Sequence, residues 1–302
     1  MSESSFTIAT RGSELALWQA RFTAERLPGE THIEIYKTQG DKIQHLSLDK
    51  VEGKGFFTKE IEDALLSGAA NVAVHSLKDL PTDEHPDLEI VAIPQRYPAH
   101  DVLLIAPGSF AEREPLSLVP GAKVGTSSIR RKAQLKAQRQ DIELVDIRGN
   151  VPTRAGRVRE DLDAVVLAEA GLVRLGLLNA DGYVTRRLSF EEMLPAPAQG
   201  ALGIQMRRDD PRAAQVRATL HCQVTAECVE IERGLLNHAG GGCHLPLGAL
   251  VEFKGRQFEA YARVTSPDGS NVLEARASGD EPSKLVTELW RDLAAQGAEH
   301  YL

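Results

Sequence analysis

Pro195-Ala-Pro-Ala-Gln-Gly-Ala-Leu-Gly-Ile-Gln-Met206 decides the fold, because two prolines here lead directly into an apolar run that is typical of a buried strand. A similar proline pair, Pro94 and Pro98, interrupts the chain much earlier. Prolines stop regular structure and stiffen linkers. Since a complete series of strands and helices lies between the two crossings, we expect a middle domain inserted into the first. The strand at 201–206 then returns to the first sheet.

Strand-like and helix-like segments follow each other in three groups. The predicted strands are 6–10, 32–37, 71–75, 88–93, 101–106, 123–125, 142–147, 164–167, 201–206, 247–253, 258–265 and 272–278. The predicted helices are 14–27, 59–66, 128–139, one from residue 152, one reaching residue 220, 225–238 and 283–296. This order predicts an α/β protein that ends in a small α+β domain. The expected domains are 1–95 with 196–212, 99–194, and 214–302.

The composition bounds what the protein can bind. Of its 302 residues 42% are hydrophobic and only 5% aromatic, so its cores depend on aliphatic side chains, as in α/β proteins. A net charge of −8 argues against general binding to nucleic acids or anionic membranes, so any anion site must be local. Residues 1–5 form no basic and apolar leader, and no window is long enough to cross a bilayer. We expect a cytoplasmic protein.

The three cysteines, Cys222, Cys228 and Cys243, are too few and too irregularly spaced for a disulfide framework. Cys228 shares a helical stripe with Ile231 and Leu235, so we predict that it packs in a core. No short Cys–Cys or His–His pair lies nearby, and we predict no metal site.

Cys243 follows three consecutive glycines, which present its thiol on a backbone without side-chain bulk. A thiol placed in this way can carry a covalent group, and its reactivity depends on the thiolate fraction. A single cysteine is a weak motif. A loop with an incidental thiol therefore stays open as the other interpretation.

Residues 123–159 contain ten Lys or Arg against three acidic residues. Lys132, Lys136 and Arg139 are typical of a solvated helix face. Arg130 and Arg131 differ, because they lie in a first helical turn, where the helix dipole disfavours each cation by about 0.3–1 kcal/mol. A bound anion would reverse that sign. We expect such an anion, with donors from the hydroxyls of Thr126, Ser127 and Ser128 and from the free backbone N–H groups.

Other polar residues follow predicted strands in the same way. Arg11 and Ser13 follow the first strand, Lys78 and Asp79 follow the third, and Arg148 and Arg154 flank a second cationic turn. Ligands of open α/β sheets bind outside the carboxyl ends of the strands. We therefore expect the two sets to face each other across an interdomain cleft. Lys54 lies in a glycine-rich segment, 51–58, that we interpret as a lid.

Six motifs, in order, resemble the porphobilinogen deaminase family, also called hydroxymethylbilane synthases. They are Thr10-Arg-Gly-Ser13, His75-Ser-Leu-Lys-Asp79, Gly125-Thr-Ser-Ser-Ile-Arg-Arg131, Arg148-Gly-Asn-Val-Pro-Thr-Arg154, Ala170-Gly-Leu-Val-Arg174 and Gly241-Gly-Cys243. The resemblance implies two domains similar to type II periplasmic binding proteins that flank a cleft, and a small α+β C-terminal domain. It also implies a transferase of porphyrin and heme biosynthesis, primed by a dipyrromethane cofactor bound through a thioether to Cys243. The implied reaction condenses four porphobilinogen molecules into hydroxymethylbilane with loss of ammonia, in a monomer.

The resemblance also implies roles for single residues, since acetate and propionate groups on each pyrrole require cations. The implied catalytic residues are Asp79, Lys78 and Arg11, with Asp79 stabilising positive charge and transferring protons. The implied cofactor-binding residues are Cys243, Ser76, Lys78, Asp79, Thr126, Ser127, Ser128, Arg130, Arg131 and Arg148. The implied substrate-binding residues are Arg11, Ser13, Arg148, Arg154, Arg174, Gln199 and Lys54.

The chain departs from the family pattern at three positions. Val173 stands where a lysine is common, His244 where glutamine is usual, and Ala198 where the return segment often has glycine. Ala198 puts the conformation of the hinge in doubt. Two other functions stay open at this point: a non-catalytic two-lobed protein that binds an oxyanion, and an enzyme that uses Lys78 as a pyridoxal phosphate Schiff base.

Overall fold

The computed structural model describes residues 5–38, 58–241 and 245–302. These fall into two compact units: unit 1 is Met1–Tyr97 with Gly200–Glu227, and unit 2 is Pro98–Gln199 with Cys228–Leu302. The chain passes from one unit to the other at 97/98 and at 199/200, within the two proline-rich segments. A third passage, at 227/228, lies inside a helix.

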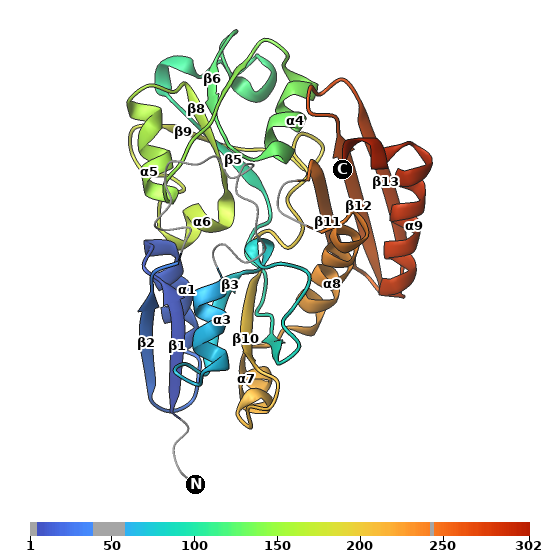
Figure 1. Cartoon of the computed structure of the whole chain (residues 1–302). Helices are drawn as coiled ribbons and strands as arrows, with labels where there is room; N and C mark the ends of the chain where they lie inside the picture. The colour runs from blue at the N-terminus through green and yellow to red at the C-terminus, as the bar shows by residue number, and fades with distance from the viewer. Residues whose placement is uncertain (1–4, 39–57, 242–244) are drawn as a thin grey trace. The chain divides into compact units, whose positions relative to one another are not determined.

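Unit 1 contains a five-stranded sheet with the order β2-β1-β3-β10-β4 (Figure 1). Its strands are β1 (Phe6–Arg11), β2 (Thr31–Tyr36), β3 (Val72–Ser76), β4 (Leu88–Ala92) and β10 (Leu202–Arg207). β1 is parallel to β2 and β3, whereas β10 is antiparallel to β3 and β4. The prediction that the strand after the second proline pair returns to the first sheet is therefore confirmed.

Helices cover both faces of this sheet. α1 (Glu14–Ala24) and α7 (Ala213–Leu220) share one core with β1, β3 and β10, and α3 (Lys59–Leu66) packs on the other face. Ser13 caps α1, as predicted, by accepting a hydrogen bond from the Ala16 N–H. The prediction that residues 214 onward join the C-terminal domain is wrong at its start, because Val216 and Leu220 lie in the core of unit 1.

Unit 2 contains a second five-stranded sheet, with the order β7-β6-β8-β5-β9. Its strands are β5 (Asp101–Ile105), β6 (Lys123–Gly125), β7 (Glu143–Val145), β8 (Ala164–Ala168) and β9 (Val184–Arg187). β6 is parallel to β7 and β8, and β5 is antiparallel to β8 and β9. Its helices are α4 (Ile129–Gln138), α5 (Val151–Gly156) and α6 (Glu169–Arg174). The sequence did not predict β9, because two arginines end this short strand and leave no alternation.

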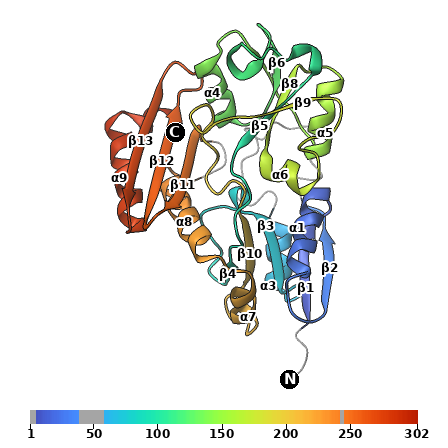
Figure 2. The same ribbon diagram turned by 180° about the vertical axis from the view of Figure 1, so that it is seen from behind.

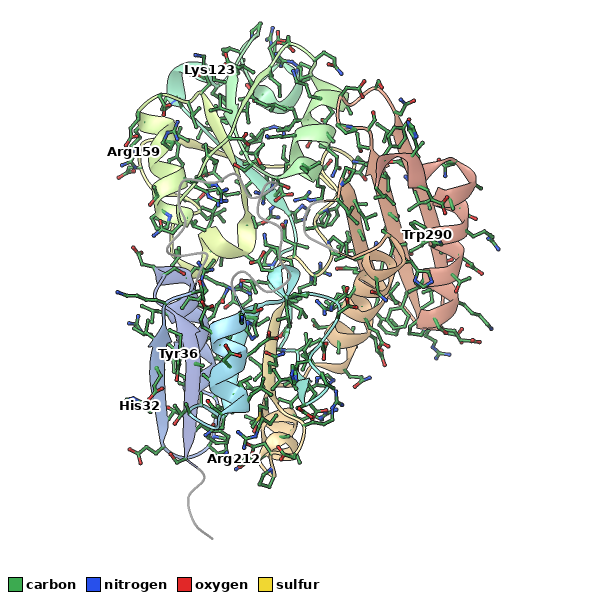
Figure 3. All side chains as sticks on the ribbon, viewed as in Figure 1. His32, Tyr36, Lys123, Arg159, Arg212 and Trp290 are labelled. Carbon is green, nitrogen blue, oxygen red and sulfur yellow. The ribbon has the colours of Figure 1, made fainter. Side chains whose placement is uncertain are left out.

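The C-terminal part of unit 2 is a three-stranded antiparallel sheet of β11 (Leu247–Lys254), β12 (Gln257–Thr265) and β13 (Val272–Gly279). α8 (Gln223–His238) and α9 (Pro282–Ala295) share one core with this sheet (Figure 2). Cys228, Ile231 and Leu235 lie in that core, which confirms the predicted stripe. Trp290 of α9 packs against its margin (Figure 3). The predicted fold class, two α/β sheets with a small α+β domain, is confirmed.

Short 3₁₀ turns complete the chain: η2 (Leu77–Asp79), η3 (Pro107–Ser109), η4 (Pro115–Ser117), η5 (Arg157–Arg159) and η6 (Ala298–Tyr301). Within the described ranges, no helix has the length and apolar character that crossing a bilayer requires.

Candidate active site

A pocket of about 100 Å³ lies in unit 1, where the carboxyl ends of β1 and β3 meet the first turns of α1 and α3. Its polar lining includes Arg11, Ser13, Gln19, Ser76 and Asp79. Four of these five residues were predicted site residues. Gln19 was missed, because one glutamine within a helix carries no sequence signal.

The pocket favours a ligand with negative charge. Two helices, α1 and α3, begin at it, and the positive end of a helix dipole attracts anions. The Gln19 amide donates a 2.8 Å hydrogen bond to Ser76 Oγ and so holds that hydroxyl in place. Thr58, which precedes α3, also lines the pocket. Its hydroxyl is buried and has no hydrogen-bond partner among the described residues, so it can serve a ligand.

Asp79 reaches the pocket from the turn η2, whose first residue, Leu77, is held by a backbone hydrogen bond and by packing. The Leu77 N–H donates a 3.1 Å hydrogen bond to the Ala201 carbonyl, and the Leu77 side chain is fully buried. Gly203 makes room for that side chain, because a Cβ at this position would lie 2.8 Å from Leu77 Cδ1. Lys78 is half-buried and Asp79 is exposed at the end of the turn, where the carboxylate can meet a ligand.

In unit 2, Arg130 and Arg131 do not point into solvent, since only 4% and 7% of their surfaces are exposed. Both bind Asp101, which is fully buried. Arg130 Nη2 lies 2.8 Å from Asp101 Oδ2, and Arg131 Nη2 lies 2.7 Å from Oδ1. Further donor groups reach the carbonyls of Leu194 and Val166. The sequence analysis missed Asp101, because nothing local links it to arginines on a helix far along the chain.

The three hydroxyls before α4 divide into two kinds. Ser127 Oγ donates to the Ile147 carbonyl at 2.8 Å, so the prediction that it donates to an anion is wrong for this conformation. Ser128 caps α4 and accepts from the Arg131 N–H, and Thr126 Oγ1 accepts from the Ser128 N–H. Accepting these bonds leaves the hydroxyl protons of Thr126 and Ser128 available to a ligand.

The remaining predicted cations occupy different environments. Arg148 and Arg154 are half-buried beside a turn in which the Asn150 side chain caps α5 by accepting from the Thr153 N–H at 2.9 Å. Arg154 Nε donates to the Gly149 carbonyl at 2.8 Å. Arg174 is 6% exposed on α6.

Two predictions about polar side chains need correction. Gln199 is fully buried, and its amide nitrogen donates to the Ala99 carbonyl at 2.7 Å and to Asp101 Oδ1 at 3.0 Å. This placement gives it a supporting role rather than a substrate contact. Arg139, predicted to be solvated, is buried and donates to Asp141 and to carbonyls of the loop 115–119. Lys54 and Cys243 lie outside the described residues, as does His244.

Comparison with known proteins names the family of this chain. The family described as "Porphobilinogen deaminase, dipyromethane cofactor binding domain" matches residues 6–215, and "Porphobilinogen deaminase, C-terminal domain" matches residues 226–295. The chain belongs to the porphobilinogen deaminase family. Porphobilinogen deaminase from Moorella thermoacetica is 42% identical over 303 residues, which cover 98% of this chain and 95% of that protein. The enzyme from Natranaerobius thermophilus is 40% identical over 300 residues, with 96% and 94% covered.

Among solved structures, the periplasmic aliphatic sulphonate binding protein SsuA from Escherichia coli is 13% identical, with 78% of this chain and 75% of that chain covered and a TM-score of 0.40. Membership in the porphobilinogen deaminase family confirms the predicted function, the transferase class and the dipyrromethane cofactor.

The donor set of unit 2 fits the cofactor of a porphobilinogen deaminase. Two buried guanidiniums share one carboxylate at Asp101, so positive charge outnumbers negative among these three side chains. Burial lowers the pKa of Arg130 from its ordinary value, and the neighbouring charge of Arg131 acts in the same direction, although Asp101 opposes both. A carboxylate-bearing cofactor would relieve this excess, and the hydroxyls of Thr126 and Ser128 are donors of the right kind.

Proposed function

We propose that this porphobilinogen deaminase joins four porphobilinogen molecules, with loss of ammonia at each addition, into hydroxymethylbilane, and that Asp79 is the carboxylate at the centre of the reaction. One observation carries this assignment: Asp79 lines the same small pocket as Arg11, Ser13 and Ser76. That pocket combines one acid with cationic and hydroxyl donors, and the substrate has the complementary groups, a pyrrole N–H and two carboxylates.

Asp79 has two tasks in this proposal. When ammonia leaves porphobilinogen, positive charge spreads over the pyrrole ring and its nitrogen. A carboxylate that accepts a hydrogen bond from the pyrrole N–H stabilises that charge most strongly as it develops. After the new carbon–carbon bond forms, the same carboxylate can accept a proton in the step that restores aromaticity.

Cationic residues bind the acidic side chains of the substrate. Arg11 lines the same pocket as Asp79, and Lys78 directly precedes Asp79 in the chain. Both serve the substrate carboxylates nearest to the reacting carbon. Ser13 donates a further hydrogen bond. The other substrate-binding residues in this proposal are Arg148, Arg154, Arg174 and Lys54. Their charge sets the preference for a polycarboxylate over a neutral pyrrole.

The dipyrromethane, when bound, supplies the pyrrole carbon to which the first substrate unit is joined. We assign its attachment to the Cys243 thiol. Its carboxylates are assigned to Ser76, Lys78, Thr126, Ser128, Arg130, Arg131 and Arg148. Asp79 also serves its pyrrole nitrogens.

The proposal extends to the organisation of the protein. It has three domains: residues 1–95 with a return segment from 196 that extends through α7, residues 99–194, and a C-terminal domain that begins in α8. We expect a monomer in the cytoplasm.

The decisive experiment measures turnover and intact mass of Asp79→Asn. The substitution keeps the shape of the side chain and removes its charge, so kcat should fall by about 10²- to 10³-fold. The mass should still include the dipyrromethane adduct. Asp87→Asn is the matched control, because Asp87 is 75% exposed and does not line the pocket. Near-normal turnover of Asp79→Asn would remove Asp79 from its role. A wild-type mass without an adduct would contradict the assigned covalent attachment at Cys243.

A further inference from the structure

Three polar side chains, two of them buried and the third, Glu62, half-buried, form a line beside the strand that precedes the Asp79 turn. His75 Nε2 lies 3.0 Å from Gln205 Oε1, and Gln205 Nε2 lies 3.1 Å from Glu62 Oε1. His75 is the last residue but one of β3, Gln205 lies on β10, and Glu62 lies on α3. His75 is 6% exposed and Gln205 is fully buried. The line thus links α3 and β3 with β10, whose Gln205 lies 130 residues after His75 in the sequence.

The chemistry of the line fixes the orientation of each member. A carboxylate only accepts hydrogen bonds, so the amide nitrogen of Gln205 must face Glu62. Its carbonyl oxygen must then face His75. An amide oxygen only accepts as well, and therefore His75 carries its proton on Nε2. Burial lowers the pKa of His75 to about 4, so the ring is neutral at neutral pH and Nδ1 has no proton.

β10 supports the turn at a second point. In the register of β3 and β10, Gly203 lies opposite His75. The missing side chain of Gly203 admits Leu77, the first residue of the turn. The strand therefore holds His75 by a hydrogen bond through Gln205, and it holds Leu77 by packing. Both residues are neighbours of Ser76, and His75, Ser76 and Asp79 all line the pocket.

We propose that Glu62 and Gln205 are positioning residues for Asp79, which act by locking His75 in its Nε2–H tautomer and so fixing the end of β3 from which the Asp79 turn departs. The inference rests on the proposed role of Asp79. Arg11 and Asp79 are the charged groups that share the pocket with His75, and Glu62 reaches the ring through Gln205.

Glu62→Gln tests this arrangement in the full-length holoenzyme. A second amide can face Gln205 with either end, so Gln205 is no longer oriented and His75 should populate both tautomers. Two-dimensional ¹H–¹⁵N spectra of the imidazole should show Nε2–H alone in the wild type and a mixture in the variant. We expect kcat to fall by about 10- to 100-fold, since small displacements of reacting groups are costly, while KM stays within about twofold. Asp63→Asn is the matched control, because Asp63 is exposed on the same helix.

Variants of His75 separate positioning from general packing. His75→Gln places an N–H donor near the position of Nε2 and should retain most of the wild-type kcat. His75→Asn is too short to reach Gln205 and should lose as much as Glu62→Gln. Wild-type kcat in Glu62→Gln, or equal losses in the two His75 variants, would overturn the inference alone. Full activity of Asp79→Asn would overturn the proposed function and the inference together.

Discussion

The five-stranded sheets of the two units share one strand order and one pattern of parallel and antiparallel pairs, yet they bury different polar groups. In each sheet the antiparallel inner strand is the one that follows a passage between the units, β10 in unit 1 and β5 in unit 2. Leu202 begins β10 opposite Ser76, and Asp101 begins β5 opposite Ala168. A buried carboxylate in unit 2 thus takes the place of a buried leucine in unit 1.

At two other positions the polar residues lie in unit 1 and the apolar residues in unit 2. By the same register, His75 and Gln205 of unit 1 correspond to Leu167 and Leu104 of unit 2, which lie in an apolar core. Asp101 binds the first turn of α4, whereas Gln205 binds Glu62 of α3. Two sheets of the same topology therefore stabilise different neighbouring segments. The polar residues of the antiparallel strand determine which segment is hydrogen-bonded to the sheet, α4 in unit 2 and α3 in unit 1.

Of the substitutions considered, Asp101→Asn should lower the free energy of unfolding most. The substitution leaves two buried guanidiniums beside a neutral amide, and removing one partner from a buried ion pair typically costs about 3–5 kcal/mol. Urea unfolding of the variant should show a loss of that size. Asp146→Asn provides the control, because Asp146 is 61% exposed and pairs with Lys132 at the surface, where the expected loss is below about 1 kcal/mol. A small loss for Asp101→Asn would mean that the arginines find other partners.

The neutral histidine of unit 1 should make stability depend on acidity. The pKa of His75 is about 4 in the folded protein and about 6.5 in the unfolded chain, so between these values only the unfolded chain binds the proton. The contribution of the neutral His75 ring to the free energy of unfolding is fully present above pH 6.5 and is lost as the pH falls toward 4. This loss amounts to about 3 kcal/mol.

Unfolding free energies at several pH values, for the wild type and His75→Gln, check this expectation. The difference between the two proteins should grow in favour of the variant as the pH falls from 6.5 to 4. A constant difference across that range would show that His75 does not resist protonation.

Local features of both sheets could be predicted from the sequence, and distant partnerships could not. Ser13 and Ser128 are predictable caps, because a cap acts within three residues. The return of β10 followed from the proline pair. Asp101 and Arg130 are a different case, since an ion pair between a strand and a later helix leaves no periodic pattern.

Gln205 carried a signal that the sequence analysis did not use. It is the polar residue within the apolar run 202–206, and a polar residue in a buried strand needs a partner. The identity of that partner still required the fold. The motifs that line the pocket in unit 1 were predictable from the sequence, whereas the pairing of Arg130 and Arg131 with Asp101 in unit 2 was not.

Gly203→Ala should sharpen the comparison at the strand that supports Asp79. Unit 2 has Val102 at the corresponding position, and its side chain is fully buried there. In unit 1 the new methyl group would press against Leu77, and such overpacking costs about 1–2 kcal/mol. Because Leu77 begins the Asp79 turn, kcat should fall as well. Gly108→Ala is the control, since a Cβ there meets no atom within 4 Å. Equal effects of the two substitutions would contradict the role of Gly203.

Ala198→Gly tests the smallest expected effect, a difference in backbone conformation between the two proline-rich segments that connect the units. Ala198 precedes β10 with a φ of +61°, and among the described residues of the first proline-rich segment no residue adopts a positive φ. A side chain in the left-handed region costs about 1–2 kcal/mol, and glycine restores part of this at an entropic cost of about 0.5–1 kcal/mol. The variant should therefore be more stable by roughly 0.5–1 kcal/mol in urea unfolding. Both substitutions remove a buried methyl group, but Ala201 has no positive φ, so Ala201→Gly relieves no strain and should destabilise the protein. If both variants lose stability, the lost burial of the Ala198 methyl group outweighs the relief of backbone strain at this passage.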